Sequence, residues 1–247
     1  MIRLHCAPAT VAVVALFALA WAAPPATAQS AIASFSQARP GAAPPTGWAP
    51  LVFPRIANHT RYALVDDDGT TVVAAAADAS ASGWTFRLDV PAARARVLRW
   101  RWKGERLPAE ADTRTRRGDD AVARVYVTFR RPDAQRAWTE RLADEAARAL
   151  YGEAPPHASL MYVWDTRAPV GTRIVNPYTD RVRNIVVESG PARLGRWLDY
   201  ERDLVADYRA AFGEDAPTIV GVAIMTDADN TAGRASARYG DIALSPR

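Results

Sequence analysis

The sequence predicts a mainly β protein: an antiparallel β-sandwich or jelly roll, with two α-helices inserted between strands and packed on its outside. Three observations predict this fold. The chain has about nine or ten short apolar runs of strand length. Two of these runs alternate strictly between apolar and other residues, and Gly, Pro and Asp turn residues separate the runs.

The start of the chain has the pattern of an export signal. An apolar run at 11–23 is too short for a stable anchor, and small residues precede an expected cut near Gln29. We expect a signal peptide at 1–28, an exported protein in the periplasm or outside the cell, and no stable membrane span after cleavage. Cys6 is the only cysteine, so the mature chain lacks a disulfide or thiolate metal site.

Two further regions follow the signal. Residues 29–46 are rich in Ala, Pro, Ser and Gly, which predicts a disordered leader. Residues 47–247 are expected to form a single β-sandwich domain, beginning at "GWAPLVFP".

The first strands are predicted by a hairpin signal. Strand-like runs at 61–65 and 70–77 are joined through Asp68-Gly69, a pair that accepts the positive φ angles of a tight turn. A further run at 83–90 ends at Pro91.

The clearest strands alternate between two faces. The run at 97–103 places apolar side chains on one face: Leu98, Trp100 and Trp102. Its other face carries basic side chains: Arg99, Arg101 and Lys103. The run at 123–129 likewise separates apolar residues (Val125, Val127 and Phe129) from Arg124, Tyr126 and Thr128.

The remaining elements complete the sandwich. Further strands are expected at 159–164, 183–189, 218–226 and 237–244. The two helices are expected at 133–150, capped by Asp133 and followed by Gly152, and at 193–212, followed by Gly213.

The charge distribution argues against nucleic-acid binding. The net charge is +4, but the arginines are scattered among acidic residues, whereas a nucleic-acid-binding protein usually has a concentrated basic face.

Three patterns carry candidate binding chemistry. Asp119 and Asp120 precede the strand that bears Arg124, and an Asp–Arg pair can hydrogen-bond sugar hydroxyls or form a structural ion pair. If the strands at 97–103 and 123–129 are neighbours, one face carries Arg99, Arg101, Arg124 and Tyr126, and otherwise these side chains form a solvated outer face. A loop at 176–181 adds Asn176 and Tyr178.

A metal site is a further candidate. Asp227, Asp229 and Asn230 directly follow an apolar strand, and carboxylate and amide oxygens are ligands that calcium prefers. Asp and Asn also form turns by bonding to their own backbone, which is the alternative here. Structural calcium is the one cofactor that the sequence suggests.

Catalytic patterns are sparse. The mature chain has only His59 and His157, and it has no nucleophile elbow, zinc pair, P-loop or dinucleotide fingerprint. A glycosidase-like carboxylate pair stays open among five acids: Asp119, Asp120, Glu188, Asp227 and Asp229.

Several long segments resemble a known family. They include "VLRWRWKGERLP", "GDDAVARVYVTF", "LMYVWDTRAPVGTRIVNPYTDRVRNIVVESG" and "GVAIMTDADNT". The chain is similar to the bacterial exported proteins grouped as domain of unknown function 3047, which implies no activity or catalytic residue. The ending "YGDIAL" is also similar to the last strand of galactose-binding-like jelly rolls, which include carbohydrate-binding modules.

Three function classes follow from these patterns. A non-catalytic module that binds a glycan or small molecule is favoured, because ligand-type residues occur without a catalytic set. The alternatives are a polysaccharide hydrolase or lyase, and a structural or accessory envelope protein that binds another protein.

Overall fold

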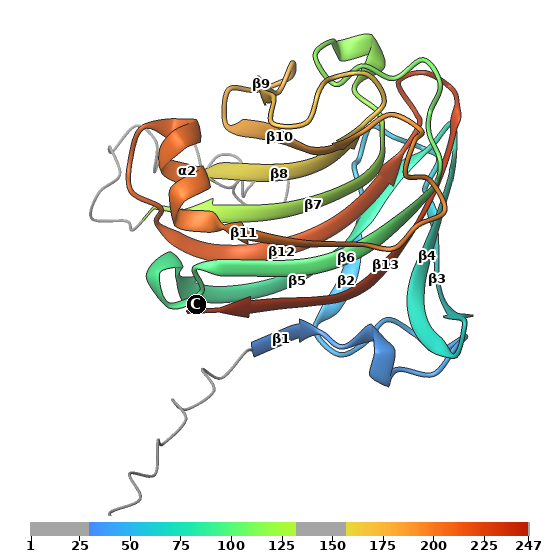
Figure 1. Ribbon diagram of the computed structural model, residues 1–247, viewed down its shortest axis with the longest axis horizontal. Coiled ribbons are helices and arrows are strands. Elements are labelled where there is room, and N and C mark those ends of the chain that lie inside the picture. The colour runs from blue at the N-terminus through green and yellow to red at the C-terminus, as the bar shows by residue number, and fades with distance from the viewer. Residues whose placement is uncertain (1–29, 132–156, 247) are drawn as a thin grey trace, which may run out of the picture.

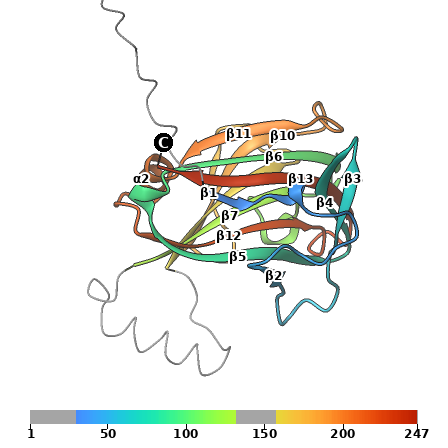
Figure 2. The ribbon, with the colours of Figure 1, turned by 90° about the horizontal axis from the view of Figure 1, so that it is seen from below.

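The computed structural model describes residues 30–131 and 157–246 of the chain. These residues form two β-sheets that pack face to face, with one α-helix at an end of the sandwich (Figure 1). The view from below shows β6 and β13 in one layer and β5 and β12 in the other (Figure 2). The mainly β class and the sandwich are therefore confirmed. No helix in the described ranges has the length and apolar character needed to cross a membrane.

The first sheet, called the six-stranded sheet below, is antiparallel throughout. In spatial order it contains β11 (Leu198–Asp203), β6 (Val97–Arg106), β13 (Arg234–Ser245), β4 (Thr70–Asp78) and β3 (Arg61–Asp67). β1 (Ser30–Ala33) pairs with the end of β13. The predicted tight turn joins β3 to β4, with positive φ angles of 54° at Asp68 and 82° at Gly69.

The second sheet is called the seven-stranded sheet. Its order is β2 (Trp48–Leu51), β5 (Ala81–Pro91), β12 (Thr218–Asp227), β7 (Ala121–Arg130), β8 (Ala158–Asp165), β10 (Val182–Ser189) and β9 (Arg173–Val175). β8 and β10 run parallel, which corrects the expectation of a purely antiparallel sandwich. The short β9 pairs antiparallel with β10 and returns the chain, so β10 can follow the direction of β8.

The core lies between the two sheets and confirms the predicted alternation of β6 and β7. Trp100 and Trp102 of β6 are 3% and 0% exposed, and Val125 and Val127 of β7 are 0% exposed. Burial of each such side chain contributes about 1.5–3 kcal/mol. The polar residues between them therefore lie on the outer faces of the sheets.

Residues 30–37 belong to the sandwich, which corrects this part of the disordered leader expected at 29–46. Phe35 is fully buried, with its ring centroid 5.2 Å from that of Trp48 and 6.4 Å from that of Trp84. The Trp48 indole N–H donates to the Ile32 carbonyl oxygen at 2.9 Å. The Ala, Pro, Ser and Gly content of this stretch predicted disorder. It nevertheless contains two apolar residues, Ile32 and Phe35, that pack in the hydrophobic core once β1 has paired with β13.

The helix expectation is also corrected. Residues 198–203, expected within the helix at 193–212, form strand β11, and only Leu204–Phe212 are helical as α2. Leu198, Tyr200 and Arg202 occupy every second position and therefore share one face of a strand, so residues 198–203 can pair with β6. Asp203 caps α2 by accepting from the Ala206 N–H at 3.0 Å, and Gly213 ends it at φ 75°. The other predicted helix, at 133–150, lies outside the described residues.

Candidate functional site

The structure gathers most of the predicted site residues at one rim of the seven-stranded sheet, where the turn before β7, the loop after β9 and the connection from β12 to β13 meet (Figure 1). We call these residues the rim cluster. They are Asp119, Asp120, Arg124, Asn176, Tyr178, Asp227, Asp229 and Asn230. The start of β7 and the end of β12 coincide because these strands are antiparallel, with Asp227 opposite Ala121.

Arg124 is the centre of the rim cluster. Its Nε and Nη2 donate to the two carboxylate oxygens of Asp227, each at 2.8 Å. Its Nη1 donates to the Asp119 carboxylate at 3.1 Å and to the Met161 sulfur at 3.1 Å, and its Nη2 also donates to the Asp119 carbonyl oxygen at 2.6 Å. All five guanidinium N–H donors therefore have protein partners, and the residue is 1% exposed.

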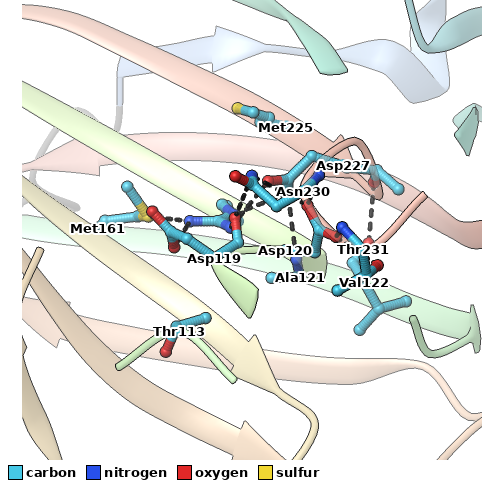
Figure 3. Close-up of polar contacts among 12 residues, drawn as sticks. Thr113, Asp119, Asp120, Ala121, Val122, Met161, Met225, Asp227, Asn230 and Thr231 are labelled. Carbon is cyan, nitrogen blue, oxygen red and sulfur yellow. Dashed lines mark hydrogen bonds and ion pairs between the residues drawn. The ribbon is translucent and has the colours of Figure 1, made fainter. Parts of the chain in front are cut away.

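Asp120 fixes the connection between β12 and β13. Its carboxylate accepts from the backbone N–H of Asn230 at 3.1 Å and of Thr231 at 2.8 Å, and from the Thr231 hydroxyl at 2.5 Å (Figure 3). Asn176 adds the third loop, because its Nδ2 donates to Asp119 at 3.0 Å. The buried part of the cluster thus joins three loops.

The rim cluster contains more negative than positive charge. Burial and the nearby charge of Asp120 raise the pKa of Asp227 to about 8, although Arg124 acts in the opposite direction. Burial and Asp120 also raise the pKa of Asp229. Protons can therefore relieve part of the excess negative charge.

The structure also bears on the predicted metal ligands. Carboxylate oxygens of Asp120, Asp227 and Asp229 lie within 4.8 Å of one another, so this trio could hold a hard cation. Asn230 has a different contact: its Oδ1 lies 2.5 Å from the Tyr178 hydroxyl. A cation would share Asp120 and Asp227 oxygens that already accept hydrogen bonds, and calcium at this place stays a prediction.

The predicted basic face is divided between the two sheets. Arg99 and Arg101 lie on β6 of the six-stranded sheet, whereas Arg124 and Tyr126 lie on β7 of the seven-stranded sheet. The expectation of one shared row is therefore corrected, because sheet membership depends on long-range pairing. Tyr126 is partly buried, and its hydroxyl lies 3.3 Å from the Met225 sulfur.

A hollow of about 370 Å³ lies on the outer face of the six-stranded sheet, and we call it the sheet groove. Its lining residues are Arg99, Trp100, Arg101, Asp199, Tyr200, Glu201, Asp241 and Ala243. The sequence predicted Arg99 and Arg101 as ligand residues. It missed Asp199 and Glu201, because their strand was expected to be a helix, and it missed Asp241, which no motif marks.

The charged side chains of the sheet groove are open to solvent. Arg99 donates to Glu201 at 2.7 Å and to the Ser245 hydroxyl at 2.8 Å, and its side chain is 36% exposed. Arg101 lies 3.8 Å from the Asp199 carboxylate and 4.5 Å from the centroid of the Trp197 ring. Guanidinium and carboxylate groups side by side can bind vicinal hydroxyl groups through paired hydrogen bonds.

Asp241 is fixed at the edge of the sheet groove by the N-terminal segment. The Ser36 backbone N–H donates to one Asp241 oxygen at 2.9 Å, and the Ser36 hydroxyl donates to the other at 2.6 Å. β1 pairs with β13 beside the groove residue Ala243. The segment that was expected to be disordered therefore orients one of the groove carboxylates.

The fold defines the chain as a β-sandwich protein with two separate polar regions, one buried at a rim and one open on a sheet. Its family follows from the sequence comparison. The chain belongs to the family described as "Protein of unknown function (DUF3047)", whose model matches residues 46–243.

Other comparisons give a distant likeness. No curated protein matches the chain. One similar solved structure is the family 11 carbohydrate-binding module of the cellulosomal cellulase Lic26A-Cel5E of Clostridium thermocellum, which is 8% identical. The match covers 89% of this chain and 95% of that one, with a TM-score of 0.43.

Proposed function

We propose that the protein is an exported, non-catalytic binding protein whose ligand, a glycan or another small polyhydroxylated molecule, lies in the sheet groove. The observation that carries this proposal is the groove itself: a hollow of about 370 Å³ on an outer face, lined by partly exposed Arg99 and Arg101 beside carboxylates. Ligand sites are concave and contain a few convergent polar groups.

Export is supported by the sequence of the first 28 residues, whose charged start, apolar run and small residues fit a cleaved signal. The periplasm and the extracellular space both contain polysaccharides that such a groove would meet. The location of the mature protein in one of these compartments is part of the proposal.

The absence of a catalytic role is supported by the state of the rim carboxylates. Asp227 has the most strongly raised carboxylate pKa in the cluster, but it is 2% exposed and both its oxygens accept from Arg124. A general acid must reach the atom that it protonates. We therefore assign Asp227 to the fold and no step of a reaction to the cluster.

A glycan screen tests the proposal. Purified protein without the predicted signal is applied to an array of neutral and acidic glycans, and binding to at least one class is expected. Hits are then incubated with the protein and analysed for chain cleavage, and intact glycan is expected. Binding to no glycan, or cleavage of a bound one, would contradict the proposed function.

A further inference from the structure

Tyr178 is the exposed residue of the rim cluster. It lies in the loop between β9 and β10 and is 53% exposed, one of four large apolar or aromatic residues so exposed in the described ranges. Its hydroxyl lies 2.8 Å from the Arg116 carbonyl oxygen and 2.5 Å from the Asn230 Oδ1. The hydroxyl end of the side chain is therefore fixed, while much of the ring remains in solvent.

One charged group lies over this ring, and a second acts electrostatically on its hydroxyl. The Arg116 guanidinium is 5.5 Å from the ring centroid, and its Nε donates to the Pro177 carbonyl oxygen at 2.8 Å. That bond uses one of five donors and holds the guanidinium plane in place. The second is Asp229, next to Asn230. It is half-buried, one of its carboxylate oxygens lies within 4.8 Å of oxygens of Asp120 and Asp227, and its negative charge adds to the effect of burial in raising the pKa of Tyr178.

The buried part of the rim cluster makes this arrangement rigid. Asp119 bonds to Asn176 and Asp120 bonds to Asn230, so these two acids hold both loops. Arg124 bonds to Asp119 and to Asp227, and so connects the segment before β7 to the end of β12. A fixed aromatic ring loses little conformational entropy when a ligand contacts it. An aromatic face beside a guanidinium and a carboxylate suits the C–H face and hydroxyl groups of a sugar.

We propose that the rim is a second binding site, which takes one sugar unit against the ring of Tyr178. Arg116 donates to a sugar hydroxyl, and Asp229 accepts from one. This site shares the ligand class of the proposed function but none of its residues, since the sheet groove lies on the other sheet. A chain with both sites can contact two parts of one polysaccharide.

The test is chemical-shift mapping with methyl glycosides of glucose, galactose and mannose, each titrated to tens of millimolar against ¹⁵N-labelled protein. The backbone amides of Tyr178, Asn230 and Thr231 are expected to shift with at least one glycoside. Asp229→Asn should weaken this response about tenfold. Tyr178→Leu should abolish it, and Tyr178→Phe, which keeps the ring, should retain it.

The double variant Arg99→Gln/Arg101→Gln separates the two sites, because it should leave the rim response unchanged. If the glycosides shift the rim amides of the wild-type protein but not the groove amides, the proposed function is contradicted and the rim inference stands. The inference is overturned if no glycoside shifts the rim amides, or if Asp229→Asn responds as wild type does. Among residues 30–131 and 157–246, Asp229 makes no side-chain hydrogen bond, so Asp229→Asn gives a result even if Tyr178→Leu does not fold.

Discussion

The rim cluster and the sheet groove are built from the same residue types, arginine and acidic side chains, but they differ in burial. The Arg124 side chain is 2% exposed, and all its donors bond within the protein. The Arg99 side chain is 36% exposed and makes two hydrogen bonds within the described ranges, which leaves donors for a ligand. Burial therefore decides which arginine holds the fold and which can bind a ligand.

The largest effect is expected at the centre of the rim. Arg124→Met removes the partner of two buried carboxylates, Asp119 and Asp227, and should lower the free energy of unfolding by about 3–5 kcal/mol. Urea denaturation measures the change. The matched control is Arg130→Met, whose ion pair with Asp89 is half exposed and should contribute less than about 1 kcal/mol. Equal losses of unfolding free energy in the two variants would show that burial does not determine how strongly these ion pairs stabilise the fold.

A smaller effect is expected from pH. Asp227 has a folded-state pKa of about 8, above its ordinary value, so the folded protein binds this proton more tightly than the unfolded chain does. This stabilisation is present at low pH and is lost as the pH rises towards 8. We expect the free energy of unfolding to fall by at least about 1 kcal/mol between pH 5 and pH 8.

Asp229→Asn is the variant that checks the pH effect. It removes a neighbouring carboxylate whose own pKa is raised, so the decrease between pH 5 and pH 8 should be smaller than in wild type. Thermal or urea unfolding at both pH values measures it. A free energy of unfolding that rises towards pH 8 would contradict the charge balance described for the rim.

The sheet groove should respond weakly in stability. Arg99→Gln and Arg101→Gln each break a solvent-exposed ion pair, and each should change the free energy of unfolding by less than about 0.5 kcal/mol. Urea denaturation of the groove variants and of Arg124→Met under the same conditions compares their free energies of unfolding directly. A loss above about 2 kcal/mol would mean that the groove arginines hold the fold as well.

The smallest effect is expected from calcium. Arg124 already supplies a cation to Asp227, and the Asp120 oxygens accept several hydrogen bonds. Melting curves with calcium and with chelator should therefore coincide. A calcium site occupied a hundredfold above its dissociation constant would add about 2.7 kcal/mol, and such a gain would confirm the metal prediction for Asp227 and Asp229 instead.

Local patterns predicted the parts of the molecule that depend on neighbouring residues. The alternation of β6 and β7 gave their buried faces, and Asp68-Gly69 gave a hairpin. Each of these features is encoded within a few residues of chain.

Features that depend on long-range pairing were not predictable from the sequence. Residues 198–203 fit a helical stripe as well as an alternating strand, and pairing with β6 selects the strand. Whether Arg99 and Arg124 share a face depends on which sheet each strand joins, and no local pattern records that. The sheet groove was therefore only half predicted, since two of its carboxylates come from β11.

The most direct test of glycan binding in the sheet groove is the glycan affinity of matched arginine variants. A glycan from the array is titrated by calorimetry against wild type, Arg99→Gln/Arg101→Gln and Arg130→Gln, which alters an exposed arginine on the opposite sheet. If the glycan binds in the sheet groove, the groove variant loses at least tenfold in affinity, about 1.4 kcal/mol, while Arg130→Gln binds as wild type does. Unchanged affinity in the groove variant would contradict binding in the groove.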